Sequence, residues 1–166
     1  MRLFLRQVLI VSALIVISAC QPGVKNMAEP LTATQLFQGQ QCGRQEPSAA
    51  VTRITDEQAL DALVQRVGKP FSFADEIDFK QQLVLLVEMG MKPTTGYRLV
   101  LSDTAVAINQ NKAVLTLAWH QPPPGVLLAQ MLTSPCVLIS LHLADYTEVE
   151  LVDSNDKHKL VFDLKQ

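Results

Sequence analysis

Charged residues are scarce in this sequence, and those present form no block of one sign. Asp, Glu, Lys and Arg make up 18% of the 166 residues, with 14 basic side chains against 16 acidic ones. Proteins that follow a phosphate backbone carry clustered Lys and Arg with aromatic residues between them. No stretch of this chain has that composition, so we expect no nucleic acid among its partners.

Histidine is also rare, and the few present are scattered. None of the three stands two or four positions from another histidine or from a cysteine, the spacing at which one element presents two metal ligands; they are His120, His142 and His158. We therefore expect surface imidazoles, with no metal and no other cofactor.

A catalytic constellation is the next candidate, because Ser134, Ser140, His142 and Asp145 lie close together in the sequence. A nucleophilic serine needs a base, an orienting group and a frame such as the strand, turn and helix of a nucleophile elbow. No such frame surrounds these residues, and alternation places Ser140 and His142 together on the outer face of a strand. We therefore expect that the protein is not an enzyme.

Only one apolar run has the character of a targeting segment. Val8–Ile17 follows Arg2 and Arg6, has the length of a signal-peptide core, and is too short to span a bilayer by itself. The alternative is an uncleaved N-terminal anchor helix. Either interpretation places the folded part outside the cytoplasm.

The residues that follow this run, Ile17-Ser18-Ala19-Cys20, resemble the lipobox of bacterial lipoproteins. The resemblance implies a signal peptide over residues 1–19, cleavage before Cys20, and acylation of that cysteine. In lipoproteins an Asp at the next position favours the inner membrane, so Gln21 implies an outer-membrane lipid anchor with the domain in the periplasm. Residues 20–34 lack an apolar face and are expected to form a flexible tether, followed by a single domain over residues 35–166.

The two remaining cysteines, Cys42 and Cys136, form an even pair in an oxidising compartment, so we expect a disulfide between them. Two buried free thiols are an alternative. Metal ligation is a weaker one, because neither cysteine has a second ligand at metal spacing.

The periodicity predicts an α+β domain with a mostly antiparallel sheet of about seven strands, curled or in a sandwich, and one amphipathic helix. Thr55–Gln58 has the form of a capping box with Thr55 at the N-cap, and Gly68 with Pro70 ends the helix that follows. The run Leu83–Val87 is apolar without alternation, which is typical of a central strand buried on both faces. Other strand candidates include 35–39, 49–54, 97–101, 104–108, 113–119, 137–143, 147–152 and 159–164.

Three stiff loops separate the apolar strands, and they are the best candidates for a binding surface. Pro and Gly fix tight turns, so these loops can hold uncharged side chains at their tips without strand partners. The alternative is that they are only the turns that tight connections require. If the loops bind a partner, they should lie together at one end of the fold. The candidate binding residues are Lys92, Pro93, Thr94, Thr95, Gly96, Tyr97, Pro123, Pro124, Gly125, Thr133, Ser134 and Pro135.

The loop spacing resembles the C-terminal domain of PrcB-type protease complex subunits, over roughly residues 78–152. The resemblance lies in Ile77-Asp78-Phe79, the apolar strand to Gly90, Lys92–Tyr97, Pro124-Gly125, Gln130 and Leu132–Pro135. Thr95-Gly96 stands where the family often has Gly-Gly, and Cys136 stands where an aromatic residue is common. The resemblance implies an exported, non-catalytic accessory protein that accompanies or stabilises a protease, with a lipoprotein as the type member.

Two alternative functions remain open. Lys92-Pro93-Thr94-Thr95-Gly96 is similar to the Asn-Pro-Thr-Thr-Gly loop of chagasin-like cysteine-protease inhibitors, which implies a loop that enters a protease cleft. Lys92 replaces the Asn, and no match to that family's Arg-Pro-Trp loop is present. The second alternative is a structural envelope lipoprotein with no protease partner, which differs from an accessory subunit only in what it binds.

Overall fold

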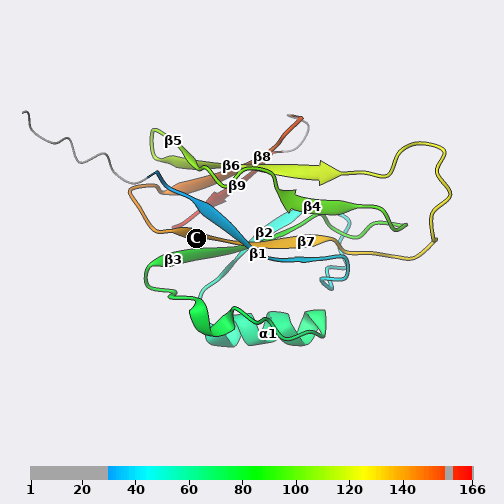
Figure 1. Ribbon diagram of the computed structural model, residues 1–166, viewed down its shortest axis with the longest axis horizontal. Helices are drawn as coiled ribbons and strands as arrows, with labels where there is room; N and C mark the ends of the chain where they lie inside the picture. The colour runs from blue at the N-terminus through cyan, green and yellow to red at the C-terminus, as the bar shows by residue number, and fades with distance from the viewer. Residues whose placement is uncertain (1–29, 156–158, 166) are drawn as a thin grey trace, which may run out of the picture.

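A computed structural model describes residues 30–155 and 159–165, which form two facing β-sheets with one α-helix outside the first sheet (Figure 1). The expected signal peptide, Cys20, His158 and most of the tether lie outside the described residues. The described residues contain no helix with the length and apolar composition of a membrane span. The elements are β1 (Ala33–Gly39), β2 (Ala50–Ile54), α1 (Glu57–Val67), a 3-10 turn (Ala74–Glu76), β3 (Gln82–Glu88), β4 (Arg98–Leu101), β5 (Ala107–Asn109), β6 (Lys112–His120), β7 (Cys136–His142), β8 (Glu148–Asp153) and β9 (Lys159–Asp163).

The first sheet has the order β1-β7-β3-β2, and all its pairs are antiparallel. Its central strands β3 and β7 are buried on both faces, because one face meets the second sheet and the other meets α1. The prediction of a central strand at Leu83–Val87 is confirmed. The prediction that Ser140 lies on an outer face is wrong: its face of β7 is the one that α1 covers, so only 6% of Ser140 is exposed, while His142 at the strand end is exposed.

The second sheet has the order β4-β6-β8-β9, with β5 also paired to β6. Most of its pairs are antiparallel, but β6 and β8 run parallel. The α+β class with a mostly antiparallel architecture and one helix is therefore confirmed, whereas the detail differs: nine strands are described rather than about seven. The parallel pair arises because the chain leaves β6 and passes through β7 in the first sheet. It then returns to the second sheet as β8, which lies beside β6 and runs in the same direction.

Two apolar cores hold these layers together. The larger core fills the space between the sheets, and Leu115, Leu117 and Trp119 of β6 point into it from one face, as their alternation predicts. The smaller core lies between the first sheet and α1, where Leu60 and Leu63 of the helix stripe are buried. The cysteines of the smaller core, Cys42 and Cys136, form the expected disulfide.

The helix ends as expected but begins differently. Gly68 adopts a left-handed conformation with φ 73° and donates its N–H to Val64 O, which closes the last turn. At the other end Asp56, not Thr55, is the N-cap: its carboxylate accepts from Ala59 N at 2.8 Å. Thr55 Oγ1 donates to that same carboxylate, so the predicted capping box is wrong. An ionised Asp binds helix N–H groups more strongly than a Thr hydroxyl does, which explains the preference.

A loop-bearing end of the sandwich as candidate binding site

The most prominent surface feature is the connection between β6 and β7, residues 121–135, which we call the projecting loop (Figure 1). It extends beyond the end of both sheets and contains no charged residue. Pro122-Pro123-Pro124 cannot donate to a strand ladder, so β6 ends at His120, and Gly125 turns the chain with φ 79°. Four large apolar side chains of this loop are exposed: Val126 (52%), Leu127 (100%), Met131 (52%) and Leu132 (61%).

A second loop, residues 92–97, lies against the projecting loop; we call it the threonine loop. Lys92 and Thr133 form a two-residue antiparallel bridge, with N–H to O distances of 2.7 and 2.9 Å. Thr95 N donates to Ala129 O at 3.2 Å, and Thr133 Oγ1 donates to Thr94 O at 3.0 Å. These bonds attach the two loops to each other, so the loops lie together at one end of the fold.

Gly96 permits this close approach. Its φ is 93°, and a Cβ placed there would lie 3.1 Å from Pro122 Cβ and 3.2 Å from Leu128 Cδ1. Any other residue would therefore be strained in its backbone and crowded against the projecting loop.

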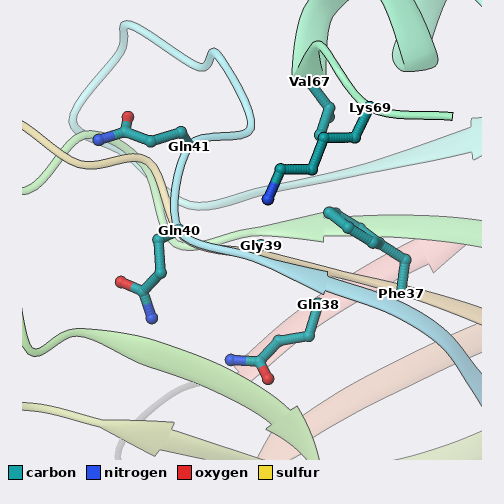
Figure 2. A pocket seen from close by; sticks show the side chains of 7 residues that line it. All are labelled: Phe37, Gln38, Gly39, Gln40, Gln41, Val67 and Lys69. Carbon is teal, nitrogen blue, oxygen red and sulfur yellow. The ribbon is translucent and has the colours of Figure 1, made fainter.

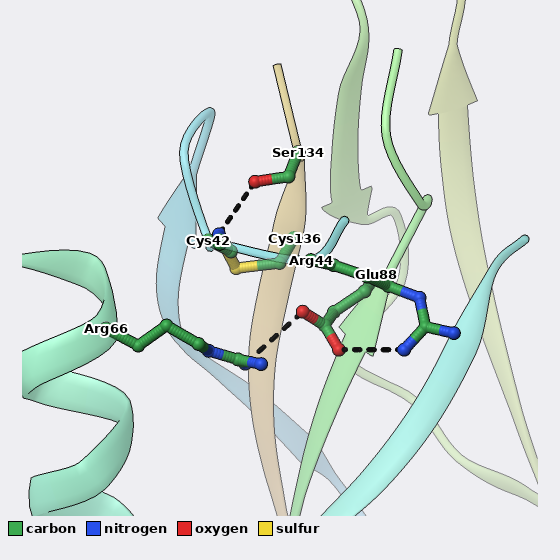
Figure 3. The surroundings of a disulfide bond; sticks show 7 residues. Cys42, Arg44, Arg66, Glu88, Ser134 and Cys136 are labelled. Atoms are coloured by element: carbon green, nitrogen blue, oxygen red, sulfur yellow. Dashed lines mark hydrogen bonds and ion pairs between the residues drawn. A yellow bond between two sulfur atoms is a disulfide. The ribbon is translucent and has the colours of Figure 1, made fainter. Parts of the chain in front are cut away.

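The C-terminal stem of the projecting loop is bound to the segment that follows β1. Ser134 N donates to Gln40 O at 3.0 Å, while Ser134 O and Oγ accept from Cys42 N at 2.9 Å and Gly43 N at 2.7 Å. The disulfide lies directly beside these bonds (Figure 3). This half of the loop is therefore held by covalent and hydrogen-bonded contacts at its base.

A buried carboxylate, Glu88, lies close to the disulfide in the same region. Figure 3 shows Glu88, at the end of β3, between Arg66 of α1 and Arg44. Arg66 Nη2 lies 3.2 Å from Glu88 Oε1, and Arg44 Nη1 lies 3.9 Å from Oε2. Among the described residues Oε1 has no partner with hydrogen-bond geometry. Loss of hydration therefore outweighs the attraction of the two cations and raises the pKa of Glu88 above its usual value.

Two small pockets flank the base of the loops. One, of about 160 Å³, is lined by Pro47, Ala49, Met89, Lys92, Tyr97, Trp119 and Gln121. The other, of about 180 Å³, is lined by Gln41, Gly43, Arg44, Gln45, Met91, Leu132, Thr133 and Ser134. A larger pocket of about 380 Å³ lies at the end of β1, where Lys69 reaches from the helix end toward Gly39 beside the Phe37 ring (Figure 2).

The sequence-predicted binding residues fall into three groups by exposure. Pro93, Gly96, Pro123, Pro124 and Gly125 are exposed; Lys92, Thr94, Thr95 and Tyr97 are half-buried; and Thr133, Ser134 and Pro135 are buried.

The buried group is held by contacts within the protein. Thr133 and Ser134 are only 1% and 5% exposed, because their side chains bond to the threonine loop and to Gly43. Their side chains position the projecting loop. Ser134 is also separated from His142 by the full length of β7, so the structure does not assemble those two into a catalytic pair.

Sequence reasoning missed the exposed apolar residues of the projecting loop. The turn chemistry predicts residues 122–125 and 132–135 as separate stiff turns and assigns no role to Val126, Leu127 and Met131 between them. A usable signal existed: an apolar tripeptide after Pro-Pro-Pro-Gly is too short and too closely bounded by turn residues to form a buried strand.

Comparisons with known proteins agree with the resemblance of the loops. The family model described as PrcB C-terminal matches residues 83–142, the span from β3 through both loops to the end of β7. Neither the curated proteins nor the solved structures contain a match to this chain. Residues 83–142 of this chain are therefore similar to the PrcB C-terminal family.

Proposed function

We propose that this protein is a lipid-anchored envelope protein whose domain binds another protein without catalysis, as an accessory to a protease or to another envelope complex. The observation that carries the proposal is the projecting loop, which exposes four large apolar side chains from a fixed base. Contiguous exposed apolar side chains are characteristic of protein contact sites. The family match is consistent with a domain that associates with a protease complex.

The stiffness of the loop favours a binding role. Three successive prolines, the bridge from Lys92 to Thr133, and the bonds around Ser134 hold its backbone before any partner arrives. A loop already fixed in its bound shape loses little conformational entropy on association. Exposed Leu127 and Val126 can therefore contribute to affinity without a large ordering penalty.

The proposed location is the periplasmic side of the outer membrane, with Cys20 acylated. The support is the signal-like run Val8–Ile17 and the lipobox-like residues that end at Cys20. The disulfide between Cys42 and Cys136 also fits an oxidising compartment. Metabolic labelling with a fatty acid tests the anchor, and label should be absent from a Cys20→Ala variant.

Site-specific photo-crosslinking in intact cells tests the binding role. A photoreactive residue at Leu127 should give a defined adduct, identified by mass spectrometry. The same residue at Ile108 should not, since Ile108 is also exposed (49%) but lies on β5 at the opposite end of the molecule. Equal crosslinking from both positions would contradict the proposal.

The identity of the adduct separates the accessory function from its alternatives. A protease or its precursor supports the protease-accessory role, and a structural envelope protein supports a structural lipoprotein instead. Inhibition through the Lys92–Gly96 loop has less support, because the backbones of Thr94 and Thr95 are bonded to the projecting loop and only Pro93 and Gly96 are exposed there.

A further inference from the structure

The 160 Å³ pocket beneath the threonine loop has a chemistry that the exposed apolar side chains of the projecting loop do not explain. Its walls come from three separate segments of the chain, residues 47–49, 89–97 and 119–121. Met89 from the end of β3 and Trp119 from the end of β6 belong to the main core, and Tyr97 packs against that core. The floor of the pocket is thus formed by one end of the main core.

The volume and lining of this pocket define the size of an occupant. A cavity of about 150 Å³ with apolar walls accommodates a group as large as a benzene ring. Two aromatic rings, a thioether and the apolar side chains of Pro47 and Ala49 form the walls here. One phenyl-sized side chain of a partner therefore matches the space.

The charge at the pocket defines the charge that an occupant should carry beside its ring. Lys92 is the single charged residue in the lining, and its ammonium lies 5.8 Å from the centre of the Tyr97 ring. No carboxylate of the described residues lies within ion-pair distance of Lys92. The backbone of Lys92 is fixed by its bridge to Thr133, so the Cα of Lys92 has a defined position beside the pocket.

We propose that this pocket binds one aromatic side chain of a partner polypeptide, and that Lys92 pairs with a carboxylate next to that side chain. The inference rests on the proposed function, because it assigns a second contact to the same end of the fold. Leu127 then contacts the partner from the projecting loop, and the pocket selects a residue of defined size and charge. The chemistry recognised is an apolar ring accompanied by an anion.

The test uses small probes that reproduce this chemistry, so it does not depend on knowing the partner. The isotope-labelled protein is titrated with 3-phenylpropionate and, separately, with 3-phenylpropionamide. The indole signal of Trp119 is followed by NMR. Binding is expected in the millimolar range for a ligand of this size. The carboxylate should bind about three- to fivefold more tightly than the amide, as expected for one partly exposed ion pair.

Matched variants assign the preference to the pocket. Lys92→Gln should bind both probes equally, and Arg98→Gln, which removes an exposed cation that does not line the pocket, should keep the wild-type preference. Absence of any Trp119 shift, or a preference for the carboxylate that survives in Lys92→Gln, would overturn the inference.

Failure of this inference differs from failure of the proposed function. Leu127→Asp should leave probe binding unchanged, because Leu127 does not line the pocket. If the probes do not bind but crosslinking from Leu127 is specific, the pocket assignment is wrong and the binding role of the loop stands. If the probes bind as expected but crosslinking from Leu127 is not specific, the pocket assignment stands and the binding role of the projecting loop is wrong.

A peptide comparison then identifies the source of the carboxylate. One peptide ends in a free C-terminal Phe, and the other has an internal Phe next to Asp and an amidated end. If either peptide binds and its binding depends on Lys92, the inference is supported. The peptide that binds then identifies whether the carboxylate is a C-terminus or an Asp side chain. Equal binding of a control peptide that has Phe but no nearby carboxylate contradicts it.

Discussion

Removal of the disulfide should lower stability by an amount that follows from its place in the chain. Cys42 and Cys136 are 94 positions apart, so their bond closes a long loop in the unfolded chain. The chain-entropy estimate for a loop of this length is about 4.7 kcal/mol at 25 °C. Both cysteines are fully buried in the core between the first sheet and α1, so truncation to Ala also removes some packing.

Urea unfolding of the oxidised wild type and of the Cys42→Ala, Cys136→Ala double variant measures this difference. We expect a loss of about 4 to 5 kcal/mol and a larger denaturant dependence, because the unfolded chain without the crosslink exposes more surface. Wild type unfolded in the presence of reductant is the control for the packing change. A loss below about 1 kcal/mol would refute the reasoning, because the crosslink would then not constrain the unfolded chain as the loop length requires.

Three further predictions concern single residues. Gly90→Ala should destabilise the fold by about 2 kcal/mol or more in urea unfolding, because φ is 78° and a Cβ there would clash with the backbone oxygen of Pro47; wild-type stability would contradict this. Burial raises the pKa of Glu88, so its contribution to stability is fully present below the unfolded value of 4.5 and is lost as pH rises through the folded value. Stability measured at increasing pH above 4.5 should therefore decline in wild type relative to Glu88→Gln, and parallel curves would show that burial does not raise the pKa of Glu88. Burial also raises the pKa of Tyr146 to about 12, so its contribution is present below pH 10 and is lost as pH rises toward 12. Tyr146→Phe should lose about 1 kcal/mol near neutral pH, where the hydroxyl donates to His142 O, and should show a smaller decline above pH 10.

Local patterns in the sequence predicted the elements that depend on local physics. The helix could be placed from its apolar stripe and from Gly68, and β3 from an apolar run that excludes water on both faces. The hairpin between β8 and β9 follows from two short apolar runs around a polar turn. In each case the residues that define the element are neighbours in the chain.

Features that depend on distant segments could not be predicted in the same way. The parallel pairing of β6 with β8 requires knowledge that β7 lies in the other sheet. Ser140 is buried because α1 covers that face of β7, and no local pattern in β7 records the position of the helix.

The candidate site also combines features that neighbouring residues predict with features that depend on distant segments. The turn chemistry of Pro93 and Gly96 marked the threonine loop, but only the fold shows that Thr133 and Ser134 are buried and that Leu127 is fully exposed. The pocket at Lys92 is assembled from three segments that are distant in the sequence, so no single motif could reveal it.

The most direct test of the binding role of the projecting loop compares two purified variants against the crosslinked partner. Leu127→Asp and Ile108→Asp each place a charge at an exposed apolar position, and neither should change the free energy of unfolding by more than about 0.5 kcal/mol. Burying a leucine side chain contributes about 1.5 to 3 kcal/mol, so calorimetry should show at least about a tenfold loss of affinity for Leu127→Asp. Ile108→Asp should bind like wild type; equal affinities for all three proteins would contradict a binding role for the projecting loop.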